Sequence, residues 1–338
     1  IELKKKYSEH KMVLSFFSPS GYEAKKESSI ADIVVYLPVD SKSNCKKFLD
    51  LINPEIVVFV KSEIWPNYLN EIQKRKIKSL LICAMYSTSQ MKYSILKKAV
   101  LKFDYIFTQD EKSKDLFKSI GHNNVINSGD TRFDRVSLSK NLNEDVDYIK
   151  EFLSEKDCLI AGSSWGDDHK MIVNYINTSN SELKYIIAPH EIHREEIETL
   201  KSSINKKTVL FSELNNENIK TASVIIVDNI GTLSKLYKYA TLAYIGGGFN
   251  GEGKLHNTLE AAVFGLPIII GKYYSKFPEA ISMIKVGGMF SVNNAESLKN
   301  KIDELIRDKE KLQKTGALNS SFIKKKIGAT QSILTNLK

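Results

Sequence analysis

Short apolar runs alternate with longer amphipathic, lysine-rich segments along the whole chain. The runs are rich in Ile, Val, Leu, Phe and Tyr, which is typical of β-strands. Because parallel strands need a long crossover, usually a helix, this alternation predicts βα units with parallel sheets. In the first half, strands are predicted at residues 12–17, 33–37, 56–60, 79–84, 105–108 and 125–127. In the second half, strands are predicted at residues 158–162, 185–188, 223–227, 242–246 and 267–270.

The two series of strands predict two domains. Residues 134–156 form a polar stretch without a strong apolar strand, and we place the domain junction near its start. A chain of 338 residues is long enough for two separate cores. The sequence thus predicts an α/β protein with two Rossmann-like, doubly wound domains, over residues 1–136 and 137–338, that face each other across a cleft. In such sheets, ligands bind beyond the carboxyl ends of the strands.

Composition places the chain among globular proteins, with 42% hydrophobic and 26% charged residues. Cys45, Cys83 and Cys158 lie far apart and form no CxxC pair, which argues against a disulfide framework and favours a reducing compartment. No apolar run approaches the roughly 18 residues of a membrane span, and the start does not resemble a signal peptide. The chain begins at Ile1 in what resembles the latter part of a helix, so we expect sequence upstream of it.

The net charge of +9 is unevenly distributed. Residues 1–136 carry 23 Lys and Arg against 16 Asp and Glu, a net charge of +7. A basic half can face anionic lipid, nucleic acid or a phosphorylated substrate. Solvated lysine-rich faces without a partner explain the charge equally well. No RNA-binding aromatic signature or zinc-finger spacing supports nucleic acid.

Residues 244–271, YIGGGFNGEGKLHNTLEAAVFGLPIIIG, are the most informative segment, because a strand, a glycine-rich loop, a helix start and a second strand follow in one unit. Gly246 to Gly248 end the first strand, where a bulky side chain would hold a ligand off the backbone. Asn257 and Glu260 follow on the first helical turns, so both can face one ligand. Glycines also end strands that bind nothing, but HNTLE and FGLP favour a donor-nucleotide site.

Polar motifs follow the predicted strands of the first half. SPSGYE occupies residues 18–23, and SEIWPN occupies residues 62–67. Glu63 leaves an apolar strand beside a Trp-Pro turn, so its carboxylate can orient a hydroxyl or act as an acid or base. The alternative is a helix N-cap or first-turn Glu.

A third motif of the first half, GDTRFD, occupies residues 129–134. Its Arg132 can bind an anionic ligand bidentately. The alternative is an ordinary ion pair with Asp130 or Asp134.

The second half adds AGSSWGDD at residues 161–168, where a strand enters a hydroxyl-rich turn and then a helix. Backbone amides there can hold a phosphate, although N-capping by Ser163 or Ser164 explains the residues equally well. In APHEIHREEI, the histidines of HEIH stand three apart rather than four, so we reject an HExxH metal site. His190 and Arg194 more plausibly meet an anionic donor. A turn at Ile230 and Gly231 follows in DNIGTL.

The order of these motifs resembles that of the Kdo (3-deoxy-D-manno-octulosonic acid) transferases of lipopolysaccharide synthesis, which have the two-domain GT-B glycosyltransferase fold. The resemblance covers nearly the whole chain, and the combination of motifs is far more specific than any one of them. It implies transfer of Kdo from CMP-Kdo to a lipid A precursor, lipid IVA, at the cytoplasmic face of the Gram-negative inner membrane. It also implies no metal or other cofactor and no nucleic-acid partner.

The resemblance further implies roles for individual residues. Glu63 would be the catalytic residue near the acceptor or the reacting sugar. The acceptor side would include Ser18, Ser20 and Gly21. The donor side would comprise Arg132, Ser163, Ser164, His190, Ile230, Gly231, Gly248, Asn257 and Glu260, with Glu260 accepting a ribose hydroxyl. The basic first half would meet the phosphates of the lipid acceptor and the anionic membrane surface.

Three departures from the family pattern affect this interpretation. The family usually has Lys in the position of Arg132, which keeps the charge, and Arg in the position of His190, which makes phosphate binding pH-dependent here. The glutamate taken as the family's general base and a hydrophobic N-terminal segment would both lie upstream of Ile1. We expect the chain to be a fragment that lacks both, and Glu63 is the candidate replacement if it is complete.

Two other functions stay open on sequence grounds. A UDP-sugar transferase or epimerase of the GT-B fold would share the glycine-rich loop and the ribose-binding Glu, but would not be expected to carry SPSGYE and EIWPN together. A binding module that keeps the donor cleft without turnover is the second. A preference for CMP over UDP would distinguish a Kdo transferase from a UDP-sugar enzyme. Nucleotide binding without sugar transfer would indicate a binding module.

Overall fold

The structure, a computed structural model, describes residues 1–141 and 144–337. The chain forms two compact units, which we describe separately. Unit 1 comprises Ile1–Asp134 together with the segment that begins at Lys326, and unit 2 comprises Arg135–Lys325. The division after Asp134 lies two residues from the predicted position 136.

The C-terminal segment differs from the prediction, which placed it with the second domain. Helix α17 (Ala329–Asn336) buries Ile333 beside Leu80 and Phe107 of unit 1. The carboxylate of Asp134 accepts hydrogen bonds from the Gly328 and Thr330 amides at 2.6 and 2.7 Å, which fixes the start of this helix. An amphipathic pattern shows that a helix has a buried face but not which core it joins, so the sequence could not reveal this return.

Unit 1 contains two parallel sheets, one of two strands in the order β1-β2 and one of four strands in the order β3-β4-β5-β6. The strands are β1 (Val13–Phe16), β2 (Ile33–Tyr36), β3 (Ile56–Val60), β4 (Lys78–Ala84), β5 (Tyr105–Thr108) and β6 (Val125–Asn127). The helices are α1 (Glu2–Lys6), α2 (Pro19–Glu23), α3 (Lys42–Ile52), α4 (Pro66–Lys74), η1 (Gln90–Lys92), α5 (Ser94–Val100) and α6 (Glu111–Ser119). Helix α7 (Thr131–Asn141) crosses from unit 1 into unit 2.

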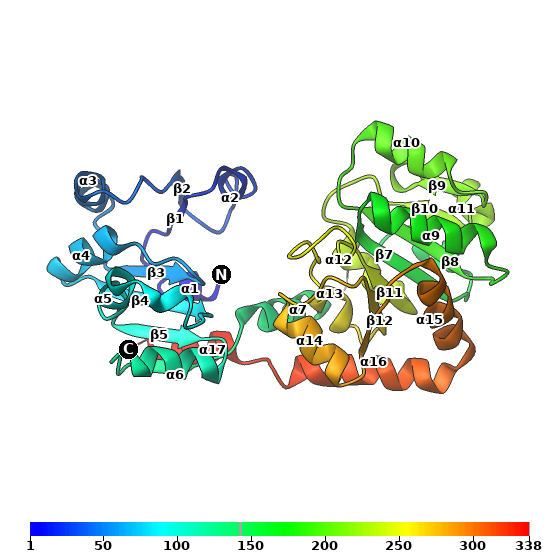
Figure 1. The fold of residues 1–338 in the computed structure, drawn as a ribbon. Helices are drawn as coiled ribbons and strands as arrows, with labels where there is room; N and C mark the ends of the chain where they lie inside the picture. Colours follow the sequence, from blue (N-terminus) through cyan, green and yellow to red (C-terminus); the bar gives the residue numbers. More distant parts are fainter. Residues whose placement is uncertain (142–143, 338) are drawn as a thin grey trace. The chain divides into compact units, whose positions relative to one another are not determined.

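Unit 2 contains one parallel sheet of seven strands in the order β13-β12-β11-β7-β8-β10-β9 (Figure 1). Its strands are β7 (Cys158–Ser164), β8 (Lys184–Pro189), β9 (Thr208–Leu210), β10 (Val224–Ile226), β11 (Leu242–Ile245), β12 (Ile268–Ile270) and β13 (Met289–Ser291). Its helices are α8 (Ile149–Leu153), α9 (Gly166–Thr178), α10 (Arg194–Ser202), η2 (Phe211–Glu213), α11 (Asn218–Thr221), α12 (Leu233–Leu236), η3 (Tyr237–Tyr239), α13 (Leu259–Ala262), α14 (Pro278–Lys285), α15 (Ala295–Arg307) and α16 (Lys309–Lys324).

All eleven predicted strands are confirmed within a few residues at each end. The prediction missed β9 and β13, which have three residues each. Segments as short as TVL and MFS carry too little apolar periodicity to stand out from a loop.

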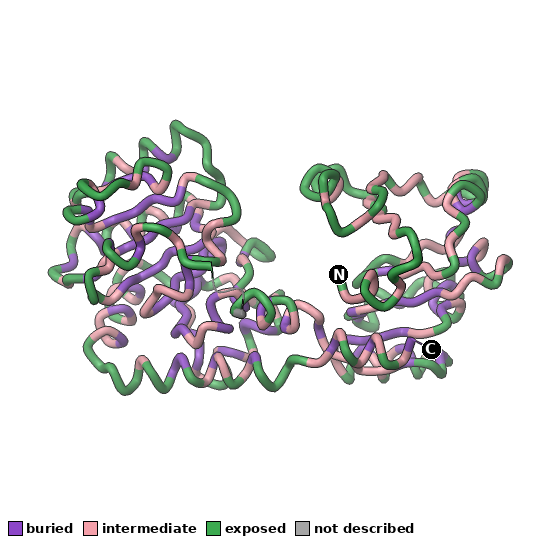
Figure 2. The backbone as a smooth tube through the Cα atoms, turned by 180° about the vertical axis from the view of Figure 1, so that it is seen from behind, coloured by how far each residue is buried: buried purple, intermediate pink, exposed green. Residues whose placement is uncertain are grey.

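The core of unit 2 lies on both faces of its sheet. Alternate residues of the central strands, such as Leu159, Tyr185 and Tyr244, pack against α9, α10 and α15. The intervening residues, such as Ile160 and Ile186, are also fully buried. Figure 2 shows this burial as purple along the strands of unit 2. Strands that are buried on both faces explain why the runs are continuously apolar rather than alternating.

The strand order of unit 2 creates a switch point beside β7. From β7 the chain moves outward through β8 to β9 and β10, and it then returns to place β11 on the other side of β7. Loops that leave neighbouring strands in opposite directions open a crevice at their carboxyl ends, where ligands of such sheets bind. The loops after β7 and β11, which carry AGSSWGDD and the glycine-rich motif, flank this point.

Candidate functional site

The loop after β7 turns sharply before α9. Ser163 has φ of 51°, in the left-handed region that few non-glycine residues adopt. Ser164 is buried, its hydroxyl lies 3.0 Å from His169 Nε2, and its carbonyl accepts a hydrogen bond from the His190 amide at 2.9 Å. Trp165 is the N-cap residue of α9. N-capping by Ser163 or Ser164, the alternative weighed above, is therefore wrong.

The fully buried carboxylate of Asp168 joins this loop to the loop after β11. Its Oδ2 accepts hydrogen bonds from the backbone amides of Trp165 and Gly247, both at 2.9 Å. Its Oδ1 accepts a hydrogen bond from the Tyr244 hydroxyl at 2.5 Å. Burial, followed by the charge of Asp168, raises the pKa of Tyr244 far above its ordinary value. Asp168 thus fixes the start of α9 against the end of β11.

The glycines of the GGG motif are buried and pack against other backbone. A Cβ on Gly246 would lie 2.4 Å from the Ser163 carbonyl oxygen, and one on Gly248 would lie 2.6 Å from the Gly271 nitrogen. Gly247 has φ of +89°, which favours glycine. We expected these glycines to admit a ligand to the backbone, but contacts within the protein already require glycine at these positions.

Three aromatic rings, from the segments that follow β7, β8 and β11, lie against one another. The Trp165 ring lies parallel to that of His190, with centroids 4.5 Å apart, and the His190 and His256 centroids lie 4.3 Å apart. Trp165 Nε1 donates a hydrogen bond to His256 Nε2 at 2.7 Å. The Lys254 ammonium lies 5.7 Å from the centroid of the Trp165 ring. Burial, then the charges of His190 and Lys254, lowers the pKa of His256 to about 4.

Asn257 and Glu260 contact each other, because the Asn257 amide donates a hydrogen bond to Glu260 Oε1 at 2.9 Å. Helix α13 begins at Leu259, so Asn257 precedes the helix and does not lie on its first turn as predicted. The Asn257 side-chain oxygen accepts a hydrogen bond from the Leu259 amide at 3.2 Å. The two side chains therefore share one surface, as their spacing predicted. Burial, followed by the charge of Glu260, raises the pKa of Tyr237 nearby.

The turn at Ile230 and Gly231 lies between β10 and α12. The Ile230 side chain is 88% exposed, Gly231 has φ of +94°, and a Cβ on Gly231 would meet no atom within 4 Å. The turn thus leaves an apolar side chain exposed.

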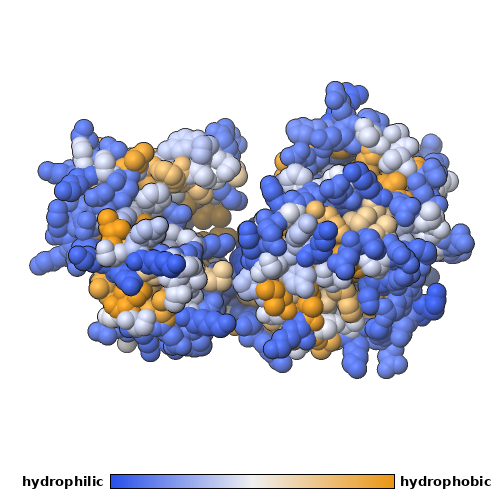
Figure 3. All heavy atoms as spheres, in the orientation of Figure 1, coloured by the Kyte–Doolittle hydropathy of each residue, from blue (hydrophilic) through white to orange (hydrophobic). Residues whose placement is uncertain are grey.

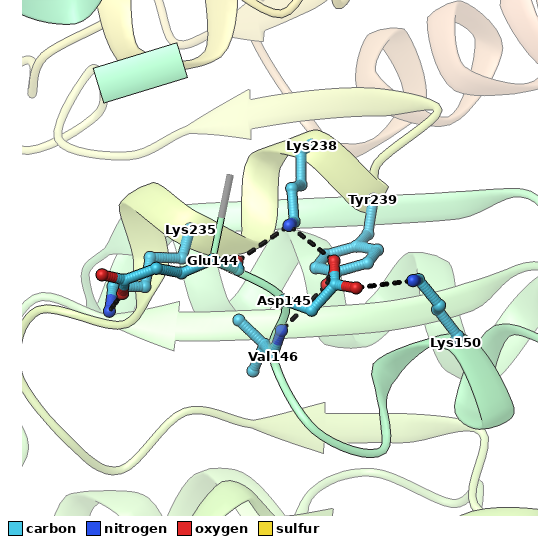
Figure 4. A network of polar contacts seen from close by, with 7 residues as sticks. All are labelled: Glu144, Asp145, Val146, Lys150, Lys235, Lys238 and Tyr239. Atoms are coloured by element: carbon cyan, nitrogen blue, oxygen red, sulfur yellow. Dashed lines mark hydrogen bonds and ion pairs between the residues drawn. The ribbon is translucent and has the colours of Figure 1, made fainter. Parts of the chain in front are cut away.

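A charged network holds α12 and η3, the helices that follow this turn. The Asp145 carboxylate accepts hydrogen bonds from Lys150 at 2.7 Å, Lys238 at 2.8 Å and Tyr239 at 3.1 Å. These donors lower the pKa of Asp145 well below its ordinary value. Figure 4 shows the network, which comprises Glu144, Asp145, Val146, Lys150, Lys235, Lys238 and Tyr239. The first described residues after α7 are thereby attached to the helices that carry the Ile230 turn.

In unit 1, Glu63 and the SPSGYE motif lie close to each other. Glu63 Oε2 accepts a hydrogen bond from Trp65 Nε1 at 2.6 Å, and the Trp65 and Phe17 ring centroids are 4.8 Å apart. Phe17 directly precedes Ser18 in the chain. Helix α4 begins at Pro66 with Trp65 as its N-cap residue, so Glu63 lies outside the helix. The alternative interpretation of Glu63 as a cap or first-turn residue is wrong.

Ser18, Ser20 and Gly21 belong to the short helix α2 and its cap. The Ser18 hydroxyl accepts a hydrogen bond from the Gly21 amide at 3.1 Å, which makes it the N-cap of α2. A Cβ on Gly21 would lie 2.8 Å from the Phe16 ring. Both serines are exposed. Capping and packing therefore account for Ser18 and Gly21, whereas no described contact accounts for the Ser20 side chain.

Arg132 forms an ion pair with Asp130. Its Nε and one terminal nitrogen both lie 2.8 Å from Asp130 Oδ2, and Asp130 is buried. The ion-pair alternative is therefore confirmed for Asp130. Asp134 accepts its hydrogen bonds from the start of α17 instead. A guanidinium held by a buried carboxylate has a fixed orientation, which is compatible with a second anionic partner.

Within residues 1–141 and 144–337, no group of three or more His, Cys, Asp or Glu side chains is arranged to hold a metal ion. No helix in the same residues combines the length and apolarity that a membrane crossing requires.

Unit 2 thus gathers the predicted residues Ser164, His190, Asn257 and Glu260 around the ends of neighbouring strands. Sequence reasoning missed the roles of Trp165, Asp168 and His256, which bond the same loops together. All three stand inside the motifs AGSSWGDD and HNTLE, but only the fold shows that the two motifs meet. The arrangement offers an aromatic surface, one fixed neutral histidine, one lysine and a glutamate beside a switch point, which suits a nucleotide with an anionic group.

Comparison with known protein families matches the two units separately. Residues 1–135 match the family model described as 3-deoxy-D-manno-octulosonic-acid transferase (kdotransferase). Residues 180–319 match the family described as glycosyl transferases group 1.

The chain is also similar to individual proteins. It is 28% identical over 327 residues to a bifunctional glycosyltransferase/methyltransferase of Fusobacterium nucleatum, covering 91% of this chain but only 50% of that protein. It is 29% identical over 317 residues to a 3-deoxy-D-manno-octulosonic acid transferase of Aquifex aeolicus, covering 92% of this chain and 83% of the relative. The chain therefore spans half the length of the Fusobacterium relative.

Among solved structures, a UDP-GlcNAc 2-epimerase from Neisseria meningitidis bound to UDP-GlcNAc aligns with a TM-score of 0.62 at 14% identity. The alignment covers 97% of this chain and 94% of the epimerase. At this identity the similarity shows the fold alone, and it confirms the GT-B architecture of two Rossmann-like domains.

Proposed function

We propose that this chain transfers Kdo from CMP-Kdo to lipid IVA in lipopolysaccharide synthesis. Its first part matches the N-terminal domain of the Kdo transferases, and its second part matches the group 1 glycosyltransferases. The match of residues 1–135 to the Kdo transferase family carries this proposal. The GT-B fold by itself would suit a UDP-sugar enzyme equally well, because fold does not fix the substrate.

The reaction is the attack of an acceptor hydroxyl on the anomeric carbon of Kdo, with CMP as the leaving group. The leaving phosphate gains negative charge, so fixed hydrogen-bond donors and cations stabilise the transition state. The hydroxyl that attacks must lose its proton to a nearby base. The site therefore needs donors near the nucleotide and a carboxylate near the acceptor.

On the donor side, we propose that unit 2 binds the nucleotide through Ser163, Ser164, His190, Ile230, Gly231, Gly248, Asn257 and Glu260. The assignment of Arg132, which belongs to unit 1, to the donor stays a prediction from the sequence. Glu260 is the candidate acceptor of a ribose hydroxyl. Its Oε1 is held by Asn257, and its Oε2 has no hydrogen bond to another described residue. A carboxylate that is oriented on one oxygen and open on the other is suited to such a contact.

On the acceptor side, we propose that Glu63 serves as acid or base, with Ser18, Ser20 and Gly21 near the acceptor. The hydrogen bond from Trp65 orients the Glu63 carboxylate, which is exposed and can reach a ligand. The contact of Phe17 with Trp65 supports this grouping, because it places SPSGYE and EIWPN at one location in unit 1.

We also propose that unit 1 contacts the cytoplasmic face of the inner membrane, whether the protein is peripheral or anchored. On and beside α5, the side chains of Tyr93 and Ile95 are 69% and 61% exposed, and Lys97 and Lys98 are exposed between them and Leu101. Figure 3 shows apolar side chains, in orange, next to hydrophilic ones, in blue, over the part of unit 1 that carries α5. Exposed apolar residues among lysines suit the boundary of an anionic bilayer.

Two measurements test the proposed function. Calorimetric titration of the chain with CMP and then UDP should show binding of CMP and much weaker binding of UDP. With Glu63 as the base, incubation with CMP-Kdo and lipid IVA, followed by mass spectrometry of the lipid, should show the mass of added Kdo. Preference for UDP would favour the alternative UDP-sugar enzyme, and CMP binding without any Kdo transfer would favour a donor-binding module.

A further inference from the structure

We propose that Trp165 is a positioning residue that holds His256 as the neutral tautomer with its proton on Nδ1, so that this N–H can bind an anionic oxygen of the nucleotide sugar. The inference rests on the proposed function for the identity of the ligand, but not for the tautomer. It assigns roles to two residues that the motif-based reasoning did not select.

The tautomer follows from the hydrogen bond between the two rings. An indole N–H can only donate, so the atom that it meets must be an unprotonated nitrogen. Trp165 Nε1 lies 2.7 Å from His256 Nε2, which makes Nε2 the acceptor. A neutral imidazole with a free lone pair on Nε2 carries its hydrogen on Nδ1.

Both residues are anchored through their backbones, so the bond does not depend on flexible loops. The Trp165 amide donates to Asp168 Oδ2 at 2.9 Å, and the His256 amide donates to the Gly246 carbonyl at 3.1 Å. Gly247, which lies between the two anchors, also donates to Asp168 Oδ2. One buried carboxylate thus sets the distance between the two rings.

A second proton on His256 is unfavourable for three reasons. Protonation of Nε2 would break the bond from Trp165, because two N–H donors would then face each other. The ring is partly buried, and burial penalises its charged form. The charged and titratable groups that face it, the His190 ring with its centroid 4.3 Å away and the Lys254 ammonium, also lower its pKa.

The other ring nitrogen is available to a ligand. Among the described residues, the His256 ring forms its hydrogen bond through Nε2, to Trp165, and none through Nδ1. Asn257, the next residue, bonds to Glu260, so His256 adjoins the side chains proposed to bind the nucleotide. With Lys254 above Trp165 the site favours an anion, and either the phosphate of CMP or the carboxylate of Kdo supplies the required oxygen.

Nitrogen-15 NMR of the histidine rings tests the tautomer without any ligand. In the wild-type chain, His256 should show an unprotonated Nε2 and a protonated Nδ1, unchanged between about pH 5.5 and pH 8. Trp165→Phe keeps an aromatic ring in the stack but removes the N–H donor. In this variant His256 should populate both tautomers and titrate at a higher pH. A wild-type His256 with its proton on Nε2, or one that titrates near pH 6.5, would overturn the inference.

Calorimetric titration tests the ligand contact. The matched control is His193→Gln, because His193 is an exposed histidine three residues after His190. Trp165→Phe should weaken CMP binding about tenfold, whereas His193→Gln should not. If the variant binds CMP more weakly but binds cytidine normally, the contact is with the phosphate. If only its affinity for CMP-Kdo falls, the contact is with the carboxylate of Kdo. Unchanged affinity for CMP and CMP-Kdo in Trp165→Phe, with an unchanged melting temperature, would overturn the contact. Failure of the wild type to bind CMP or CMP-Kdo would overturn both the proposed donor and this contact, but not the tautomer.

Discussion

The buried carboxylate of Asp168 offers the sharpest test of how the site is assembled. It accepts hydrogen bonds from the amides of Trp165 and Gly247 on one oxygen and from the Tyr244 hydroxyl on the other. The substitution Asp168→Asn keeps the shape of the side chain but removes its charge. It also turns one of the two acceptor atoms into an NH2 donor.

The cost of this change follows from the contacts. In its best orientation, the Asn oxygen keeps the two amide donors but loses the strengthening that an ionised acceptor gives, about 1 kcal/mol for each bond. Its NH2 then faces Tyr244, whose hydroxyl must accept, and the hydroxyl hydrogen loses its partner at a cost of about 1–3 kcal/mol. Removal of a buried charge offsets part of this loss. We therefore expect unit 2 to be destabilised by about 2–4 kcal/mol.

Urea unfolding followed by tryptophan fluorescence measures this change in unit 2 alone. The chain has two tryptophans, Trp65 in unit 1 and Trp165 in unit 2, so a Trp65→Phe background leaves one reporter beside Asp168. Asp167→Asn is the matched control, because Asp167 is exposed and its ion pair among the described residues is with Lys170 at 2.9 Å. The control should change the free energy of unfolding by less than about 0.5 kcal/mol. An equally small effect of Asp168→Asn would refute the view that this carboxylate holds the two loops together.

Three further predictions concern the donor loop, the proposed reaction and the charged network. Gly248→Ala should lower the melting temperature of unit 2 by an amount equivalent to about 1–3 kcal/mol, because its Cβ would meet a backbone nitrogen, whereas Gly166→Ala, which meets nothing within 4 Å, should not. In a transfer assay, Glu63→Gln should abolish turnover, and its affinity for CMP should stay largely intact. Glu260→Gln should weaken CMP binding about tenfold. If Glu63→Gln instead weakened CMP binding and Glu260→Gln abolished turnover, the two residues would have each other's roles. Asp145 has a depressed pKa in the folded protein, so its contribution to stability is present above the ordinary value of 3.8 and is lost as the pH falls below it. Asp145→Asn should therefore lower stability at neutral pH and reduce its loss during acid titration, and parallel acid profiles for the two proteins would contradict the network.

The sequence predicted the central strands of unit 2 well because they are buried on both faces. Runs such as LLICA in β4 and YIIA in β8 are continuously apolar, and helical segments with regular polar positions separate the runs. The sequence did not predict the three-residue strands β9 and β13, because they contain no continuous apolar run of this kind. The return of α17 to unit 1 was also unpredictable, since Ile333 and Leu337 would suit either core.

For the candidate site, the sequence identified the motifs but not how they are joined. Ser163 and Ser164 were weighed as helix caps, whereas Trp165 occupies that position and its indole bonds to a residue 91 positions later. Such a contact has no local periodicity, so neither propensity nor spacing can reveal it. The sequence predicted Asp168 as an acidic residue in the first turn of a helix. Its bond to Gly247 becomes visible only when β7 and β11 lie side by side.

The residues of the glycine-rich motif therefore divide by what their mutation can prove. Gly246 and Gly248 have no room for a Cβ, so their substitution will impair the fold whether or not they touch a ligand. Asn257 and Glu260 lie outside the core and bond mainly to each other, so their substitution reports on binding with little effect on stability. A loss of CMP binding supports the assignment of this motif to the donor only when it follows substitution of Asn257 or Glu260. The same loss from the glycines would show no more than that the loops after β7, β11 and β12 must pack closely for any site to form there.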